Sequence, residues 1–211
     1  MAPSKKETPS HRRAVPAQRR SAETVDRILA ASLTILDELG LQAFNTNAVA
    51  AGAGVNVGTV YHYFPDKNSI LRELFERHES RRAEWVAGRL DELATTNDVH
   101  AWVADVLKGI VRIRKATPGT QVLRSAIRVV PELQRIEDEL DARSVAVLAD
   151  AIRRRYPGLT KQRATAVART IVETSTVVLD RASEKGSSQT TAIGELVELI
   201  SAYLGSLPRR R

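Results

Sequence analysis

The residues of this chain that could do chemistry cluster between positions 46 and 65, and they suit recognition better than catalysis. Two short helical patterns meet there at Gly54, and the outward face of the second carries short or planar side chains: Asn56, Val57, Thr59, Tyr61 and His62. Two short helices joined by a Gly-containing turn form a helix-turn-helix, whose second helix enters the major groove of DNA. The stretch therefore predicts binding to duplex DNA, and a purely structural helical hairpin is the alternative.

Sequence patterns typical of catalysis or metal binding are missing. The four histidines (His11, His62, His78 and His100) form no i,i+4 pair and no HExxH motif, and there is no Gly-rich phosphate loop or GxSxG motif. The sequence has no cysteine, which excludes disulfides, thiolate catalysis and thiolate-bound zinc. We therefore expect neither an enzyme nor a bound cofactor or metal ion.

The positive charge is concentrated at the start of the chain. The formal net charge is +7; residues 1–20 carry six basic side chains against one acidic, whereas residues 21–68 carry two against five. Attraction to phosphate would therefore come mainly from residues 1–20, which we expect to be a disordered basic arm. Arg19 and Arg20 are placed to follow the DNA backbone or to enter the adjacent minor groove. A solubilising tail is the alternative.

The compartment can also be predicted. No run of about 18 apolar residues could span a membrane, and residues 1–20 lack the apolar segment of a secretory signal. The absence of cysteine fits a reducing environment. We expect a cytoplasmic protein without a membrane partner.

Hydrophobic periodicity predicts helices along the chain. The first spans Ser21 to Leu39 and ends at a left-handed Gly40; the others span about 46–53, Asn56 to Phe64, a long helix from Asp66, Asp98–Lys115, Gly119–Val129, Glu132–Arg155, Thr160–Glu184 and Thr191–Leu204. No segment shows the sustained alternation of a strand. The expected fold is all-α, with a three-helix DNA-binding domain (residues 21–67) and a helical-bundle ligand-binding and dimerisation domain (residues 68–207).

One order of residues is specific to a known family. A helix ending at Leu39-Gly40 is followed by Phe44, by Val49-Ala50, by Ala53-Gly54-Val55, and by the run Gly58-Thr-Val-Tyr-His-Tyr-Phe-Pro-Asp-Lys67, with Leu71 beyond. In this order residues 21–75, about a quarter of the chain, resemble the N-terminal domain of the TetR family of transcriptional repressors.

The resemblance implies a set of DNA contacts. Thr46 and Asn47 would touch phosphate or a base edge; Asn56, Val57, Gly58 and Thr59 would lead the recognition helix into the groove; Tyr61 and His62 would reach phosphate or thymine methyl groups; Lys67 would bind phosphate. Arg19, Arg20, Asn45 and Tyr63 complete the expected DNA-binding residues. Val57 departs from the family, which commonly has a long polar residue there, so this position could offer only an apolar contact.

Two apolar stripes predict a homodimer, which the reading of two operator half-sites also requires. Thr160–Glu184 and Thr191–Leu204 each carry apolar and small side chains on one side, and two protomers could join these into a four-helix interface about a two-fold axis. The expected interface residues are Ala164, Ala168, Ile171, Ser175, Val178, Leu196, Ile200 and Tyr203. The alternative is that both stripes face the protomer's own core.

The resemblance further implies a repressor that binds a palindromic operator in double-stranded DNA and is released by an unidentified small-molecule effector. The residues that could wall or anchor its pocket are Trp85, Trp102, Arg112, Arg124, Arg128, Glu173, Thr174 and Thr176, of which we single out Trp102, Arg124 and Thr174. An activator, and a helical small-molecule-binding protein whose helix-turn-helix no longer reads DNA, are the alternatives.

Overall fold

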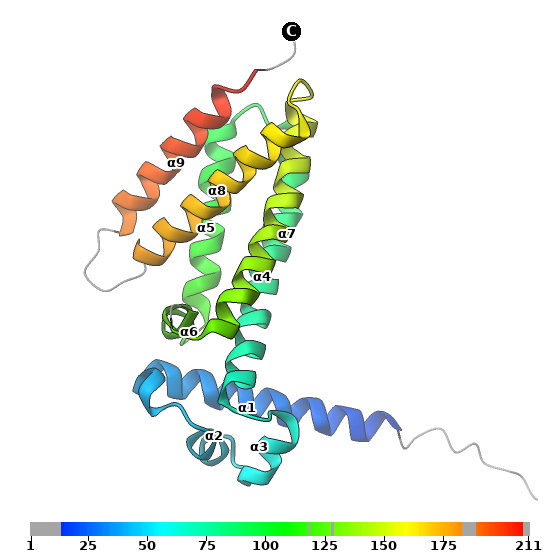
Figure 1. Cartoon of the computed structure of the whole chain (residues 1–211), viewed down its shortest axis with the longest axis vertical. Coiled ribbons are helices and arrows are strands. Elements are labelled where there is room, and N and C mark those ends of the chain that lie inside the picture. Colours follow the sequence, from blue (N-terminus) through cyan, green and yellow to red (C-terminus); the bar gives the residue numbers. More distant parts are fainter. Residues whose placement is uncertain (1–13, 118, 128, 183–188, 209–211) are drawn as a thin grey trace, which may run out of the picture.

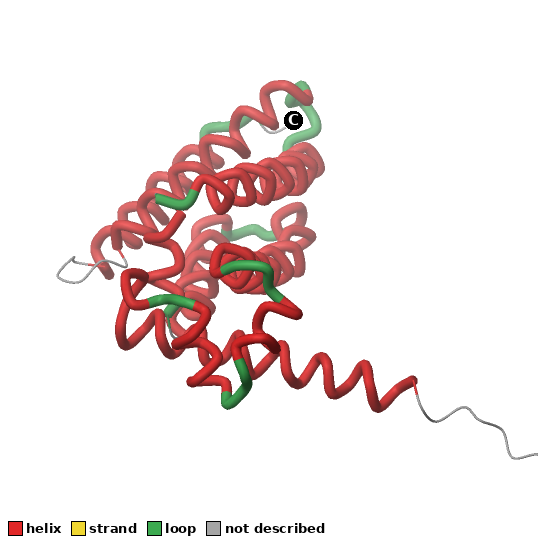
Figure 2. Tube along the Cα trace, turned by 60° about the horizontal axis from the view of Figure 1, so that its bottom comes forward, coloured by secondary structure: helices red, strands yellow, loops and turns green. Residues whose placement is uncertain are grey.

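The computed structural model describes residues 14–117, 119–127, 129–182 and 189–208, and these residues form helices joined by short loops, without a strand (Figures 1 and 2). The helices are α1 (Ala14–Ala43), α2 (Thr46–Ala53), α3 (Val57–Tyr63), α4 (Lys67–Thr95), α5 (Val99–Ala116), α6 (Thr120–Ile127), α7 (Pro131–Arg155), α8 (Lys161–Ala182) and α9 (Gln189–Gly205). The predicted all-α fold is confirmed.

The helices divide into a small module and an elongated bundle. Figure 1 shows α1, α2 and α3 at the lower end, with α4 rising from them into the bundle. In the bundle α7 packs against both α4 and α8, and α9 packs against α5 and α8. The short α6 lies between the two parts and contacts α1 as well as α4 and α7.

Side-chain caps set the boundaries of the helix-turn-helix. The Oδ1 atoms of Asn45, Asn56 and Asp66 accept hydrogen bonds from the backbone N–H groups three residues on, which begins α2, α3 and α4. Gly54 ends α2 with φ 64°, the left-handed conformation that glycine adopts at no steric cost. These caps confirm the predicted order of short helix, turn and recognition helix.

The first helix differs from its prediction at both ends. It begins at Ala14 rather than Ser21, and the Ser21 hydroxyl lies within the helix and donates to the Tyr63 hydroxyl at 3.1 Å. Gly40 has the predicted positive φ, 75°, but the helix resumes and ends at Ala43. Residues 14–20 of the predicted arm are therefore helical, and residues 1–13 lie outside the described part of the chain.

Two hydrophobic clusters form the core. One fills the lower module around Ile28, Phe44, Val60 and Phe75, and it also contains Leu123, Ala126 and Ile127 of α6. The other fills the bundle from α4 and α5 to α9. Because α6 contributes apolar side chains to the lower cluster, it is packed as part of the small module although it follows α5 in the chain.

Candidate nucleic-acid interface and internal cavity

The predicted DNA-reading face lies on the outside of the small module. Tyr61 is 52% exposed and Val57 is 38% exposed, and Asn47, Gly58, His62 and Lys67 are exposed beside them. The Tyr61 hydroxyl lies 3.1 Å from Thr46 Oγ1, so the recognition helix is tied to the first turn of α2. This bond holds two of the predicted contact residues in a fixed relation.

Three predicted contact residues are engaged within the protein instead. Asn45 uses both ends of its amide, accepting from the Ala48 N–H and donating to the Ala43 carbonyl. Asn56 Oδ1 accepts from both the backbone N–H and the hydroxyl of Thr59. Tyr63 is half-buried and accepts from Ser21. Asn45 therefore positions α2, Asn56 and Tyr63 position the recognition helix α3, and the Thr59 hydroxyl donates its proton to Asn56.

The basic residues before the module are exposed on α1. Arg19 forms an ion pair with Glu23 at 3.1 Å, whereas the Arg20 side chain has no ion pair within the described residues. Arg20 is therefore the freer of the two charges that were predicted to follow the phosphate backbone.

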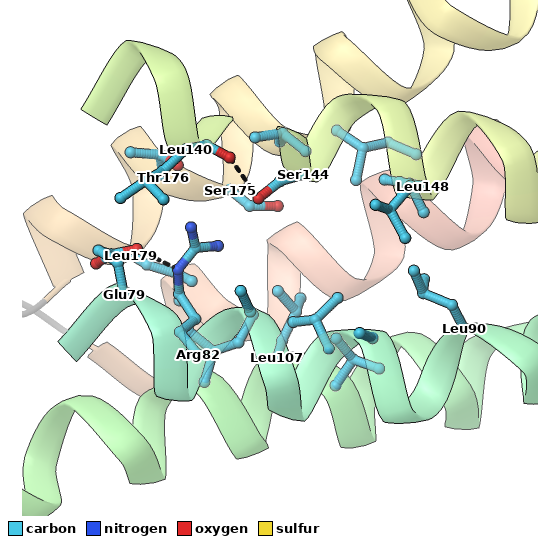
Figure 3. Close-up of a pocket in the computed structure, with 18 of the residues that line it drawn as sticks. Glu79, Arg82, Leu90, Leu107, Leu140, Ser144, Leu148, Ser175, Thr176 and Leu179 are labelled. Carbon is cyan, nitrogen blue, oxygen red and sulfur yellow. Dashed lines mark hydrogen bonds and ion pairs between the residues drawn. The ribbon is translucent and has the colours of Figure 1, made fainter. Parts of the chain in front are cut away.

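The bundle contains a partly open cavity of about 420 Å³ (Figure 3). Its wall is built from α4, α5, α7, α8 and α9 and is mostly aliphatic. Figure 3 shows Leu90 and Leu148 at one end, and Glu79 with Arg82 facing Ser175 and Thr176 at the other. The volume falls within the range of sites that bind small organic molecules.

The polar end of the cavity belongs to a buried ionic network. Arg124 of α6 donates from Nε and Nη2 to the two oxygens of Asp180 at 2.6 and 3.0 Å, from Nη1 to Glu79 at 2.9 Å, and from Nη2 to Glu137 at 2.8 Å. Glu79 also accepts from Arg82 Nε at 2.5 Å. Arg114 donates to Asp180 at 2.9 Å. The network thus joins α4, α5, α6, α7 and α8.

Burial and charge shift the pKa values in this network. Burial alone would raise the pKa of Glu79, but the charges of Arg82 and Arg124 outweigh it and hold that pKa below its ordinary value. Burial raises the pKa of Asp141 to about 6, with Arg82 opposing the shift. Burial lowers the pKa of His78 to about 4 and that of Arg114 to about 10.

Only some of the candidate pocket residues line the cavity. Trp102 and Thr176 line the cavity, whereas Thr174, Glu173, Arg112 and Trp85 do not. The Trp85 indole lies against Gly109, where a Cβ atom would collide with it. Arg124 forms the centre of the ionic network behind the wall, and Arg128 lies outside the described residues. Sequence periodicity missed Arg82, because a single Arg on a long charged helix carries no distinguishing signal.

The predicted dimer stripes need a correction. Ala164, Ala168, Leu196 and Ile200 are at most 3% exposed within one protomer, so they pack in its own core and cannot meet a partner. Ile171 and Ser175 line the cavity, and Val178 and Tyr203 are half-buried. The opposite faces of the same two helices expose Val177 and Leu199, each 53% exposed, with the small residues Ala166 and Ala202. The sequence pattern identified the buried stripe but could not tell what covers it.

Among the described residues no group of three or more His, Asp or Glu side chains could hold a metal ion. No helix in the same part of the chain is long and apolar enough to cross a membrane.

Known proteins resemble this chain over both of its parts. Residues 28–74 match the family of bacterial regulatory proteins described as tetR, and residues 98–204 match the tetracyclin repressor-like C-terminal domain. The HTH-type transcriptional regulator CymR of Pseudomonas putida is 35% identical over 80 residues, which is 38% of this chain and 39% of CymR. BetI of Cronobacter sakazakii is 26% identical over 141 residues, 62% of this chain and 66% of BetI. The matches thus span less than two thirds of either relative.

A TetR-family regulator from Streptomyces coelicolor has the same fold, with a TM-score of 0.62 and 27% identity over 88% of this chain and 99% of that one.

Proposed function

Because this chain belongs to the TetR family of transcriptional regulators, which are not enzymes, we propose that it is a repressor whose homodimer binds a palindromic operator and is released when a small molecule enters the bundle cavity. The cytoplasm, where the operator DNA lies, is the proposed site of action.

The observation that carries this proposal is the position of α6. Arg124 of this helix binds Glu79, which lines the cavity, at 2.9 Å. Leu123, Ala126 and Ile127 of the same helix are buried with the core of the DNA-binding module. A ligand that displaces the polar wall of the cavity therefore acts on α6, which is packed against the DNA-binding module.

The proposed DNA contacts are exposed groups on the outer face of the module. Asn47, Val57, Gly58, Tyr61 and His62 face outward on α2 and α3, where the recognition helix would enter the major groove. Arg20 and Lys67 are exposed cations at the edges of this face and would bind phosphate. Arg19, Thr46 and Thr59 support the same surface through their pairing within the module.

The proposed dimer joins the exposed faces of α8 and α9. These helices pack against each other, so Ala166 and Val177 on one and Leu199 and Ala202 on the other belong to one side of the bundle. Small residues would let two-fold related helices approach closely. The two DNA-binding modules of such a dimer would bind operator half-sites about 34–36 Å apart.

Release follows from a shift of population. The effector must bind more tightly to a conformation in which the two DNA-binding modules no longer match the half-sites. A ligand with equal affinity for both conformations would not change the equilibrium between them. α4, which carries Glu79 and Arg82 and begins in the small module, and α6 are the elements through which the cavity would act.

The test is a gel shift with the full chain and the DNA upstream of its own gene. We expect a saturable complex that unrelated DNA does not displace. The variant His62→Ala, which removes an exposed side chain from the reading face, should bind at least tenfold more weakly, whereas Arg153→Ala, exposed on α7, should bind as the parent does. Absence of any complex in this DNA and in a genome-wide selection of binding sites would favour a helical protein that no longer reads DNA.

A further inference from the structure

We propose that the effector is an organic monocarboxylate, a molecule with an apolar body and one acid group, and that Arg82 binds the acid. This inference rests on the proposed function in one respect, because it takes the bundle cavity to be the effector site.

The mostly apolar wall of the cavity suits a ligand with an apolar body. Aliphatic side chains such as Leu90, Leu107 and Leu148 surround most of it, and Trp102 adds an aromatic surface. Toward one end, Arg82 on α4 faces the hydroxyls of Ser175 and Thr176 on α8 (Figure 3), and Glu84, Arg143 and Ser144 are further polar residues of the wall. A ligand that fills this space buries an apolar body along α4 and places a single polar group at the Arg82 end.

The hydrogen-bond donors at that end lack acceptors. Arg82 uses Nε to bind Glu79, but its two terminal nitrogens make no hydrogen bond within the described residues, and Nη2 lies 3.8 Å from Asp141. Arg114, which also lines the cavity, has a buried Nε without a partner. A buried N–H without a partner, such as that of Arg114 Nε, is costly unless an acceptor reaches it. A ligand carboxylate supplies two acceptor oxygens in the planar geometry that a guanidinium matches.

Two acidic side chains at the Arg82 end are already paired with arginines, which disfavours a cationic group there. Glu79 is shared by Arg82 and Arg124, and Asp180 is shared by Arg124 and Arg114. Asp141, close to Arg82, would repel a group with two negative charges more strongly than a group with one. The acid group should therefore carry a single charge, which distinguishes a carboxylate from a phosphate monoester.

The experiment measures binding to the full-length protein by calorimetry with two matched series of probes. One series is octanoate, octanol and octylammonium; the other is naphthoate, naphthol and naphthylmethylammonium. In at least one series we expect the carboxylate to bind at least tenfold more tightly than the alcohol, and the ammonium compound not to bind. Equal binding of acid and alcohol, preference for the ammonium compound, or no binding by either series would overturn the inference.

Variants test the role of Arg82. Arg82→Met should abolish the preference for the acid and leave alcohol binding within twofold, whereas Arg81→Met, an exposed neighbour outside the cavity wall, should change neither. Asp141→Asn removes the negative charge beside Arg82 and should tighten carboxylate binding severalfold, a gain that a poorly folded variant cannot produce. An unchanged acid preference in both Arg82→Met and Asp141→Asn would show that the acid is bound elsewhere.

Failure of this inference differs from failure of the proposed function. A protein that binds its operator in the gel shift but prefers no carboxylate remains a repressor with another effector. A protein that binds the carboxylates but no DNA refutes the repressor and leaves the assignment of Arg82 standing.

Discussion

The Asp37 carboxylate of α1 accepts a hydrogen bond from the backbone N–H of Gly119, with an N···O distance of 2.9 Å. Gly119 precedes α6 and has φ 71°, and a Cβ atom at this position would lie 2.6 Å from the Leu33 carbonyl oxygen. The turn that begins α6 is therefore pressed against the backbone of α1. Only glycine permits both this conformation and this approach.

Gly119→Ala should disturb the contact between this turn and α1. A left-handed conformation costs a residue with a Cβ atom about 1–2 kcal/mol, and the backbone carbonyl of Leu33 cannot rotate away as a side chain could. We expect the free energy of unfolding in urea to fall by at least about 2 kcal/mol. Gly158→Ala is the control, because Gly158 has no positive φ and open space around its Cβ position. Equal stability of the two variants would contradict a close contact between the turn at Gly119 and the backbone of α1.

Arg124→Met should be strongly destabilising. Its guanidinium binds Glu79, Glu137 and Asp180, and its removal leaves buried carboxylates without their shared partner, which typically costs about 3–5 kcal/mol. Arg154→Met is the matched control, since the Arg154–Asp91 pair is exposed on both sides and such pairs contribute about 0–1 kcal/mol. Urea denaturation of both variants checks the difference, and a loss at Arg124 no larger than at Arg154 would show that the network is not needed.

The sequence was sufficient for the features that are local. The predicted helix starts at Asn56 and Asp66 and the predicted end at Phe64 agree with the caps of α3 and α4, because helix capping depends on a few neighbouring residues. The ionic network was not predictable. Arg124 and Asp180 are 56 positions apart, and nothing in the spacing of charged residues indicates which of them are brought together by tertiary packing.

The dimer prediction shows a second limit. Periodicity identified the buried stripes of α8 and α9, but Ala168 and Ile200 contribute to the protomer's own core. A buried stripe has the same sequence pattern whether its own chain or another covers it. The more informative residues were Val177 and Leu199, apolar side chains on faces that are otherwise small or polar.

The revised interface can be tested with one charge. Val177→Glu should weaken the dimer by at least about tenfold in sedimentation equilibrium, because a carboxylate would be desolvated at the contact. Val129→Glu, at an exposed valine outside α8 and α9, should remain dimeric. Ala168→Arg, at a residue of the interface expected from the sequence, should unfold the protein because Ala168 is fully buried within one protomer. A folded Ala168→Arg monomer would restore the original interface.

Arg20→Gln should make DNA binding less dependent on salt. If Arg20 neutralises one phosphate, the slope of log K against log salt concentration falls by about 0.9. This single change is cleaner than deletion of residues 1–20, because α1 begins at Ala14 and the deletion would remove part of a helix. Arg153→Gln, on the exposed face of α7, is the control. An unchanged slope would assign the phosphate attraction to other residues.

Asp141→Asn should stabilise the protein more at pH 8 than at pH 5. Burial raises the pKa of Asp141 to about 6 from an ordinary 3.8, so the folded state binds this proton more tightly than the unfolded state. Ionised Asp141 therefore costs stability above pH 6, and this cost fades as pH falls toward 3.8. The groups that act on it are Arg82, Glu137, Glu79 and Arg124, and all are retained in the variant.

The measurement is the difference in unfolding free energy between variant and parent at the two pH values, which we expect to shrink by roughly 1 kcal/mol from pH 8 to pH 5. Using the difference removes the contribution of His78, whose pKa is lowered to about 4 by burial and which destabilises both proteins alike as pH falls. Glu139→Gln, an exposed acid on α7, should show no such pH dependence. A difference that grows toward pH 5 would mean that Arg82 stabilises the ionised form of Asp141 by more than burial opposes it.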